Sequence, residues 1–268
     1  MALAPSLPDG ARDAVEAFVR DHVADAGASG VVLGLSGGVD SALVTALAAQ
    51  ALGPRRVATF FLPIDRVPQG DLADARATAK KFKVSLEVHD LTGAFLGMAQ
   101  AARAKDRFVR GNLKARVRMA FLYAEANRRG ALVLGTGNKS ELLTGYFTKW
   151  GDGGCDLLPI GDLYKTQVRE MAAALGVPKH AITKPPSAGL WPGQTDEGDL
   201  GIKYADLDRV LLGLELKMDD ATLARRSGVP LAKVRAVRAR VERAAHKRRM
   251  PLVCKLGMRT VGIDWREG

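Results

Sequence analysis

Short apolar runs alternate along this chain with longer segments in which apolar residues recur at helical spacing. The runs are predicted as strands over 31–35, 57–62, 84–88 and 131–135, and the longer segments as helices over 11–26, 40–52, 69–82 and 107–129. The first run is apolar throughout, which suits a strand buried on both faces of a parallel sheet. Alternation of strand and helix predicts right-handed crossovers. We therefore expect an α/β fold, a parallel twisted sheet with helices on both faces.

The turn after the first predicted strand is rich in small residues. Ser36-Gly37-Gly38 separates that strand from a helix opened by Asp40 and Ser41. Two glycines let an anion approach the backbone, and a helix N-terminus adds unpaired N–H groups and the positive end of its dipole. The turn is therefore predicted to cradle phosphate groups, although a Gly-Gly turn also serves packing alone. The common G-x-x-x-x-G-K-[ST] phosphate loop does not occur in the chain.

A second acid, Glu141, follows the strand predicted at 131–135, as Asp40 follows the first strand. Ligands of parallel sheets bind beyond the carboxyl ends of the strands. Mg²⁺ prefers one or two carboxylates together with phosphate oxygens. The two acids are therefore candidates to hold magnesium beside a bound phosphate chain, while a plain helix cap is the alternative role for Glu141.

The organisation of the chain is predicted to be simple. It shows no internal repeat, and we expect a single domain over 1–268. An irregular stretch that begins with two prolines predicts a mobile lid at about 184–200, followed by a helical part over 204–250. Within that part, 219–245 has a helix, a Gly-Val-Pro turn and a basic helix, which is also the pattern of a helix-turn-helix DNA-binding protein.

The composition of the chain indicates which binding partners and which cellular compartment to expect. The net charge is +11, from 40 Lys and Arg against 29 acids, which favours a polyanionic partner, either nucleic acid or a nucleotide. Cys155 and Cys254 lie far apart without a C-x-x-C pair, which argues against a zinc site or a disulfide framework and for a reducing compartment. There is no secretory leader pattern and no apolar run long enough to span a bilayer, so we expect a soluble, cytoplasmic protein.

The string SGGVDS at 36–41 resembles the pyrophosphate loop of the ATP-pyrophosphatases, enzymes that adenylate a substrate and release pyrophosphate. Further blocks resemble the NAD synthetases of that family, namely GNLKARVRM at 111–119, the stretch 135–165 with GYFTKWGDGGCD, the stretch 184–208, and HKRRMP at 246–251. One departure is Gly189, where many members have aspartate. The resemblance implies an adenine nucleotide alpha hydrolase-like, Rossmann-like version of the expected fold.

The resemblance also implies roles for individual residues. The residues implied for ATP are Gly34, Leu35, Ser36, Gly37, Gly38, Val39, Ser41, Thr136, Lys165 and Ser187. Those implied for deamido-NAD are Arg116, Lys149, Asp156, His246 and Lys247. Asp40 and Glu141 are implied as magnesium ligands, and the catalytic set is Asp40, Lys165 and Ser187.

The implied reaction is the ATP-dependent amidation of deamido-NAD. An acyl-adenylate and pyrophosphate form first, and ammonia then gives NAD and AMP. Glutamine-using relatives carry an added amidohydrolase domain, for which 268 residues leave no room, so we expect free ammonia or a separate glutaminase subunit as the source of nitrogen. A homodimer is implied, and nucleic acid is not an expected partner. A tRNA thiolase stays an alternative, although the paired cysteines usual in those enzymes are missing.

Overall fold

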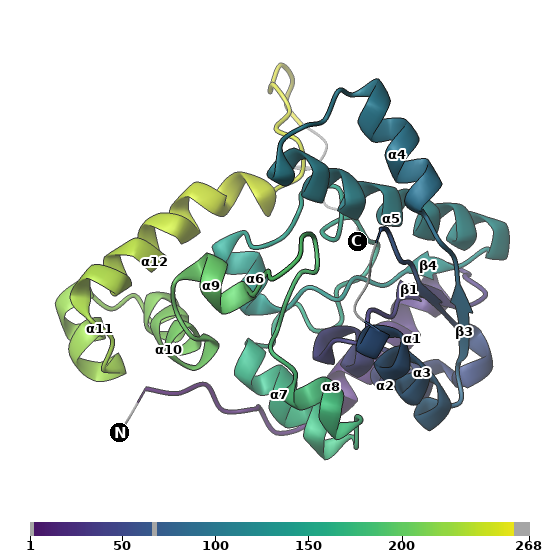
Figure 1. Ribbon diagram of the computed structural model, residues 1–268. Coiled ribbons are helices and arrows are strands. Elements are labelled where there is room, and N and C mark those ends of the chain that lie inside the picture. The colour runs from purple at the N-terminus through teal and green to yellow at the C-terminus, as the bar shows by residue number, and fades with distance from the viewer. Residues whose placement is uncertain (1–2, 66–68, 260–268) are drawn as a thin grey trace.

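A parallel sheet forms the centre of the molecule. The computed structural model describes residues 3–65 and 69–259. Within them the sheet contains β1 (Val31–Gly34), β2 (Val57–Phe61), β3 (Ser85–Val88) and β4 (Leu132–Val133). All pairs are parallel, in the order β3-β2-β1-β4 (Figure 1). The expected parallel sheet is confirmed, and every strand lies inside its predicted apolar run.

Successive residues of β1 enter two different cores. Val31 and Leu33 pack in one hydrophobic cluster with residues of α1 (Ala11–Asp25), α2 (Val39–Leu52), α3 (Gln69–Phe82), α7 (Lys165–Ala174) and α8 (Lys179–Thr183). Val32 packs in another cluster with residues of α4 (Thr92–Ala101) and α5 (Arg107–Arg129). Because side chains alternate along a strand, helices cover both faces of the sheet, as predicted (Figure 1).

The strand order fixes where a ligand can bind. The chain runs outward from β1 to β2 and β3, and then returns to place β4 on the other side of β1. The switch point of the sheet therefore lies between β1 and β4, and ligands of open α/β sheets bind outside the carboxyl ends of the strands at such a point. Two helices start there, α2 directly after β1 and α6 (Lys139–Thr144) after β4.

The C-terminal helices form a second body with its own hydrophobic cluster. It contains α9 (Asp196–Leu200), α10 (Tyr204–Glu215), α11 (Asp220–Ser227), α12 (Leu231–Arg243) and the short 3₁₀ helix η2 (Ala244–Lys247). Leu207, Leu223 and Val234 are fully buried in this cluster and come from α10, α11 and α12 in turn. The predicted helix pair in 219–245 is thus present. Its apolar faces pack against α10 (Figure 1).

Two features complete the fold. Helix α4 was not among the predicted elements, since Gly93 and Gly97 interrupt its sequence and glycine disfavours helix interiors. The short 3₁₀ helix η1 (Pro54–Arg56) leads into β2. In the described part of the chain, the helices are too short or too polar to cross a membrane.

Candidate active site

The glycine-rich turn between β1 and α2 is held by the hydroxyl groups of two serines. The Ser41 hydroxyl donates to the carbonyl of Gly38 (3.1 Å) and accepts from the N–H of Ser36 (3.2 Å). The N–H of Gly38 in turn donates to the Ser36 hydroxyl (3.3 Å). Gly37 has φ of 83°, and a Cβ there would lie 2.4 Å from the carbonyl oxygen of Asp71. The turn therefore requires glycine, and its geometry presents the N-terminus of α2 at the switch point.

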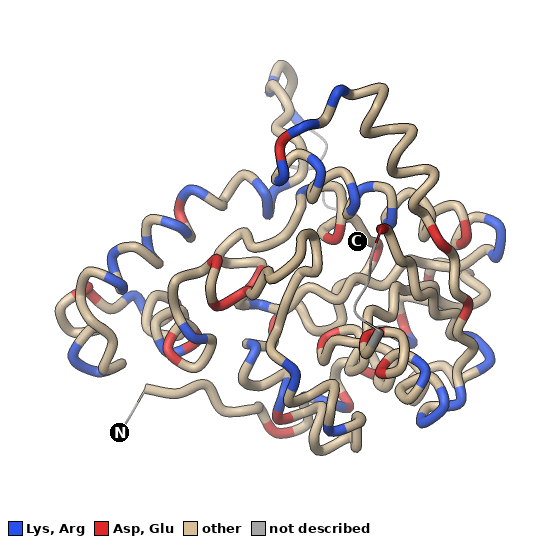
Figure 2. Tube along the Cα trace, viewed as in Figure 1, with Lys and Arg blue, Asp and Glu red and all other residues tan. Residues whose placement is uncertain are grey.

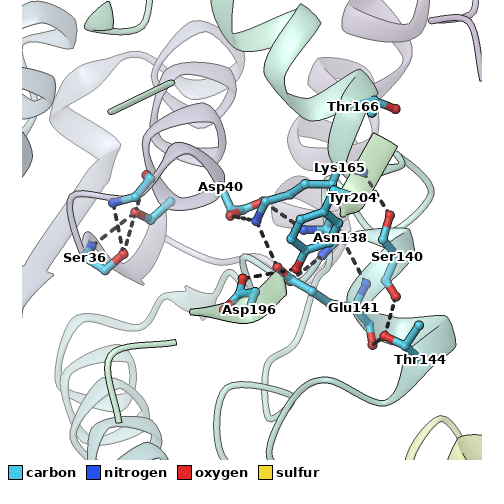
Figure 3. Close-up of polar contacts among 12 residues, drawn as sticks. Ser36, Asp40, Asn138, Ser140, Glu141, Thr144, Lys165, Thr166, Asp196 and Tyr204 are labelled. Carbon is cyan, nitrogen blue, oxygen red and sulfur yellow. Dashed lines mark hydrogen bonds and ion pairs between the residues drawn. The ribbon is translucent and has the colours of Figure 1, made fainter. Parts of the chain in front are cut away.

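A carboxylate–lysine cluster, consisting of Asp40, Glu141 and Lys165, lies beside this turn (Figure 3). Lys165 Nζ donates to Asp40 Oδ2 (2.6 Å) and to Glu141 Oε1 (3.0 Å). The lysine side chain is 1% exposed, against 18% and 16% for the two acids. The structure thus brings together two strand-end acids predicted to be neighbours, and it adds the predicted lysine between them.

Burial and charge act against each other in this cluster. Burial raises the pKa of Glu141, and the nearby Asp40 raises it further while Lys165 opposes both. For Lys165, burial lowers the pKa, but attraction to Asp40 and Glu141 outweighs burial, so that the pKa lies above its ordinary value. One cation shared by two acids leaves the cluster one negative charge in excess when all three are ionised, which suits an added cation.

Asn138 orients both acids and was not found from the sequence. Its side-chain Nδ2 donates to Asp40 Oδ1 (2.9 Å), and its backbone N–H donates to Glu141 Oε2 (3.3 Å). Its Oδ1 accepts from the N–H of Glu141 (3.1 Å), which completes a capping box at the start of α6. Glu141 therefore caps its own helix and also binds Lys165. An asparagine three residues before a glutamate is the sequence pattern of a capping box, and it could have predicted this role of Asn138.

Tyr204 approaches the cluster from α10, also without a sequence prediction. It is fully buried, and Lys165 Nζ lies 5.1 Å from the centre of its ring. Its hydroxyl donates to Asp196 Oδ2 (3.1 Å), while Asp196 Oδ1 is buried without a hydrogen-bond partner. The second helical body therefore supplies one wall of the site (Figure 3).

Two of the residues expected to bind ATP, Ser187 and Thr136, form no hydrogen bond with the carboxylate–lysine cluster among the contacts of the described residues. The exposed Ser187 hydroxyl donates to the carbonyl of Gln194 (2.7 Å) and accepts from the N–H of Gly189 (3.1 Å), so it is engaged within its own loop. Thr136 lies half-buried in the connection between β4 and α6. The start of the loop is tied to α3, because Lys184 forms ion pairs with Asp71 and Asp74.

Four of the five residues expected at deamido-NAD lie together in a cationic face, defined here as Arg116, Lys149, His246 and Lys247. The Arg116 guanidinium donates to the carbonyl of Lys149 (3.3 Å), and Lys149 Nζ donates to the carbonyl of His246 (2.9 Å). Lys247 Nζ donates to the carbonyls of Gly145 and Phe147, both at 2.7 Å. The GYFTKWGDGGCD loop is therefore connected by hydrogen bonds to α5 and η2.

A cavity of about 330 Å³ opens at this cationic face. Its walls come from the loop and from the chain after α12, namely Lys149, His246, Arg249, Met250, Pro251 and Leu252. Lys and Arg also recur along α5 and α12, which flank this region (Figure 2). In the described residues, the three lysine and arginine members of the cationic face form no ion pair within 4 Å. Their charges are therefore open to an anionic ligand.

Asp156, the fifth of these residues, has its hydrogen bonds elsewhere. Its Oδ1 accepts from the Tyr123 hydroxyl (2.9 Å), and its Oδ2 accepts from the N–H of Val133 (2.7 Å). The neighbouring Cys155 thiol has its pKa raised to about 11, chiefly by burial and then by Asp156. A thiol of that kind is a poor nucleophile near neutral pH.

Comparison with known proteins gives a consistent picture. The sequence model described as NAD synthase matches residues 12–251. The chain is 45% identical over 252 residues to the NH(3)-dependent NAD(+) synthetase of Methanosarcina mazei, covering 92% of this chain and 98% of that protein. It is 47% identical over 245 residues to the enzyme of the same name from Archaeoglobus fulgidus, covering 89% and 94%.

Solved structures agree with these sequence matches. The NH3-dependent NAD synthetase of Campylobacter jejuni superimposes with a TM-score of 0.78 at 29% identity, covering 91% of this chain and 97% of that one. The NMN synthetase of Francisella tularensis gives a TM-score of 0.81 at 33% identity, covering 94% and 100%. Both similarities cover more than nine-tenths of this chain.

Proposed function

The chain belongs to the NAD synthase family, and from that premise we propose that it amidates deamido-NAD with ammonia at the expense of ATP, giving NAD, AMP and pyrophosphate. The observation that carries the proposal is the carboxylate–lysine cluster at the N-terminus of α2, within reach of a turn built to hold phosphate. The names of the relatives indicate synthesis of NAD with ammonia. The two carboxylates and the lysine of the cluster are suited to binding the ATP that such a reaction uses. This activity makes the chain a ligase that forms a carbon–nitrogen bond.

ATP binds, in this proposal, with its phosphates against residues 34–41 at the start of α2. The backbone N–H groups there and the helix dipole favour anions. Lys165 supplies a cation beside them. Thr136 and Ser187 are proposed as further contacts, and for Ser187 this requires the loop around it to exchange its internal hydrogen bonds for bonds to ATP.

Magnesium is a proposed companion of ATP, and the residues present fit it. Asp40 and Glu141 each contact the same ammonium group, so both carboxylates are within reach of a single cation. The donors are all oxygen, as Mg²⁺ prefers, and two protein carboxylates with phosphate oxygens are a usual magnesium set. Bound there, the ion would neutralise charge on the phosphates.

The reaction proposed here needs no protein nucleophile. The nicotinate carboxylate attacks the α-phosphorus of ATP, the bond to pyrophosphate breaks, and an acyl-adenylate forms. Ammonia then attacks the acyl carbon, the bond from that carbon to the AMP oxygen breaks, and the amide loses a proton. The chain contributes positioning, the Lys165 charge and the N–H groups at the start of α2, which would face the phosphate oxygens where negative charge collects.

Deamido-NAD is proposed to bind at the cationic face. Arg116, Lys149 and Lys247 donate only to backbone carbonyls among the contacts described, and these are bonds that a phosphate or carboxylate can replace with stronger charge-assisted ones. Asp156 is proposed to turn from its contact with Tyr123 toward the dinucleotide. The basic surplus of the sequence is then explained by a nucleotide rather than by nucleic acid.

A homodimer is part of the proposal. Large apolar side chains are exposed on α4 and α5, including Leu96, Met98, Phe108 and Val109, and a second chain would cover such residues. Sedimentation equilibrium at micromolar concentration should give twice the monomer mass. A monomer under those conditions would contradict this part of the proposal.

The function is tested by pyrophosphate release and NAD formation from Mg-ATP with alternative acceptors and nitrogen donors. Deamido-NAD with ammonium should give both products, and deamido-NAD with glutamine should give little NAD. Nicotinate mononucleotide is the necessary rival acceptor, because the chain also resembles a structure named NMN synthetase. A higher kcat/KM with the mononucleotide than with deamido-NAD would overturn the substrate assignment.

A further inference from the structure

Asp208 is a buried acid on α10 that no step of the proposed reaction uses. Its side chain is 0% exposed. Oδ1 accepts from the Ser140 hydroxyl (2.5 Å), and Oδ2 accepts from the N–H of Thr166 (2.8 Å). The Ser140 hydroxyl oxygen also accepts from the N–H of Lys165 (3.0 Å). One carboxylate therefore holds, directly or through Ser140, the first two N–H groups of α7.

These contacts join the starts of two helices that carry the cluster. Helix α7 begins at Lys165, and its first N–H groups have no partner within the helix. Ser140 is the second residue of α6 and immediately precedes Glu141. An acid at a helix N-terminus is favoured by the helix dipole, and an acid removed from water requires hydrogen bonds of this kind. Asp208 thus bridges the backbones that bear Lys165 and Glu141.

The same helix also holds the side chain of Lys165. Tyr204 lies one turn before Asp208 on α10, and its ring lies beneath the Lys165 ammonium at 5.1 Å. Helix α10 is therefore linked to Lys165 at two points, to its backbone N–H through Asp208 and Ser140, and to its ammonium through Tyr204. Figure 3 shows Ser140, Lys165 and Tyr204 gathered around Glu141.

We propose that Asp208 is a positioning residue, which fixes the Lys165 ammonium relative to Glu141 by tying the start of α7 to the start of α6. The catalytic role of Asp208 rests on the proposed function. The link that Asp208 forms between the starts of α6 and α7 is a property of the fold. A residue that served only to anchor α10 would affect stability, and the folded fraction of its variants would keep the kcat of the native enzyme.

The test compares Asp208→Ala and Asp208→Asn with Val210→Ala. Val210 is equally buried on the same helix, in the second hydrophobic cluster, and its apolar side chain cannot form a hydrogen bond with Ser140, Lys165 or Thr166. Misplacement of a reacting group by about 1 Å costs on the order of 10²-fold in rate. We expect a kcat loss of that size for Asp208→Ala, with KM for deamido-NAD unchanged. Asp208→Asn should lose less, because its amide oxygen still accepts one hydrogen bond.

Ser140→Ala provides a second variant that removes only a hydroxyl group and is expected to fold. Combined with Asp208→Asn it should lose less kcat than the product of the two separate losses, because both remove the same link. For the double variant with Ser140→Ala and Val210→Ala, the loss of kcat should equal the product of the two separate losses. Multiplicative losses in the first pair, or a native kcat in folded Asp208→Ala, would overturn the proposal.

Amide hydrogen exchange tests the link formed by Asp208 independently of the proposed function. The N–H of Thr166 should exchange at least about tenfold faster in Asp208→Ala than in Val210→Ala, since it loses its acceptor, whereas the N–H of Lys165 keeps Ser140 as its acceptor. That result does not depend on which substrate the enzyme uses. A native exchange rate at Thr166 in Asp208→Ala would refute the link from Asp208 to α7, even in an active enzyme. A native protein without activity, whose Asp208→Ala variant shows the expected exchange, would refute only the proposed function.

Discussion

The carboxylate–lysine cluster and the cationic face handle charge in opposite ways. In the cluster, Lys165 is buried and bonded to two acids, and Asn138 holds a further oxygen of each acid. In the cationic face, Arg116 and Lys149 donate to neutral carbonyls instead. The first arrangement is fixed by paired charges before any ligand arrives. The second keeps its cations weakly engaged and leaves their charge for a ligand.

The difference predicts different consequences of substitution. Removing Lys165 from the cluster leaves two negative charges without a cation in a partly buried site, so the chemistry and the fold both suffer. Removing Arg116 or Lys149 from the cationic face leaves a carbonyl in an exposed position that water can reach, so binding suffers and the fold does not. The first three of the four predictions below test this contrast, beginning with the largest expected effect, and the fourth tests the burial of Cys155.

Lys165→Met should lower kcat by about 10²- to 10³-fold, since it removes a cation directed at developing negative charge. It should also lower the free energy of unfolding by about 3 kcal/mol, because Asp40 and Glu141 then face each other without a compensating cation. Lys179→Met, at an exposed position, is the matched control. Steady-state rates and urea unfolding measure the two effects. Native stability in Lys165→Met would contradict the view that the cluster is fixed by paired charges.

Glu141→Gln keeps the shape of the side chain and removes its charge. The Mg²⁺ concentration for half-maximal rate should rise by about tenfold or more, given the loss of a proposed carboxylate ligand. Glu170→Gln, exposed on α7, should leave the magnesium dependence as it was. Equal magnesium curves for the native enzyme and Glu141→Gln would remove Glu141 from the proposed metal site.

Lys149→Met should raise KM for deamido-NAD by about tenfold to a hundredfold with kcat nearly unchanged, which is the effect of losing one charged hydrogen bond. The KM of the native enzyme should rise with ionic strength more steeply than that of the variant, since salt screens an exposed cation. Titrating KM in potassium chloride tests both points. A loss confined to kcat would show that Lys149 acts in the chemical step instead.

Cys155 should react slowly with iodoacetamide. Its pKa is raised to about 11, so at pH 8 only about one thiol in a thousand is ionised, and the thiolate is the reacting form. The rate should therefore increase about tenfold per pH unit from 8 to 10. Mass spectrometry follows the reaction, with the exposed Cys254 as an internal reference. A rate at Cys155 independent of pH would contradict the raised pKa.

Much of the sheet and one side of the site were predictable because the signals are local. An apolar run followed by Ser36-Gly37-Gly38 specifies a strand, a tight turn and a helix start within a few residues. The contact of Tyr204 with the cluster, and the link from Asp208 to the residues beside it, were not predictable. They join helices that are distant in the sequence, and only the packing of the second hydrophobic cluster brings these side chains to the site.

The cationic face shows the same limit in another form. The family resemblance indicated which cations belong together, but not that their present partners are carbonyls of the chain itself. Ser187 and Asp156 illustrate this most clearly, because each has its hydrogen bonds satisfied within the protein. Their roles toward ATP and deamido-NAD stay predictions. Hydrogen bonds made in the absence of substrate depend on side-chain geometry that residue type and spacing do not encode.

The central claim is that the two regions bind different ligands, and calorimetry of two variants with two ligands tests it most directly. Titration of Mg-ATP and, separately, of deamido-NAD into Glu141→Gln and Lys149→Met gives four affinities to compare with the native enzyme. The account predicts that Glu141→Gln weakens Mg-ATP alone and Lys149→Met weakens deamido-NAD alone. Equal weakening of both ligands by either variant would contradict it.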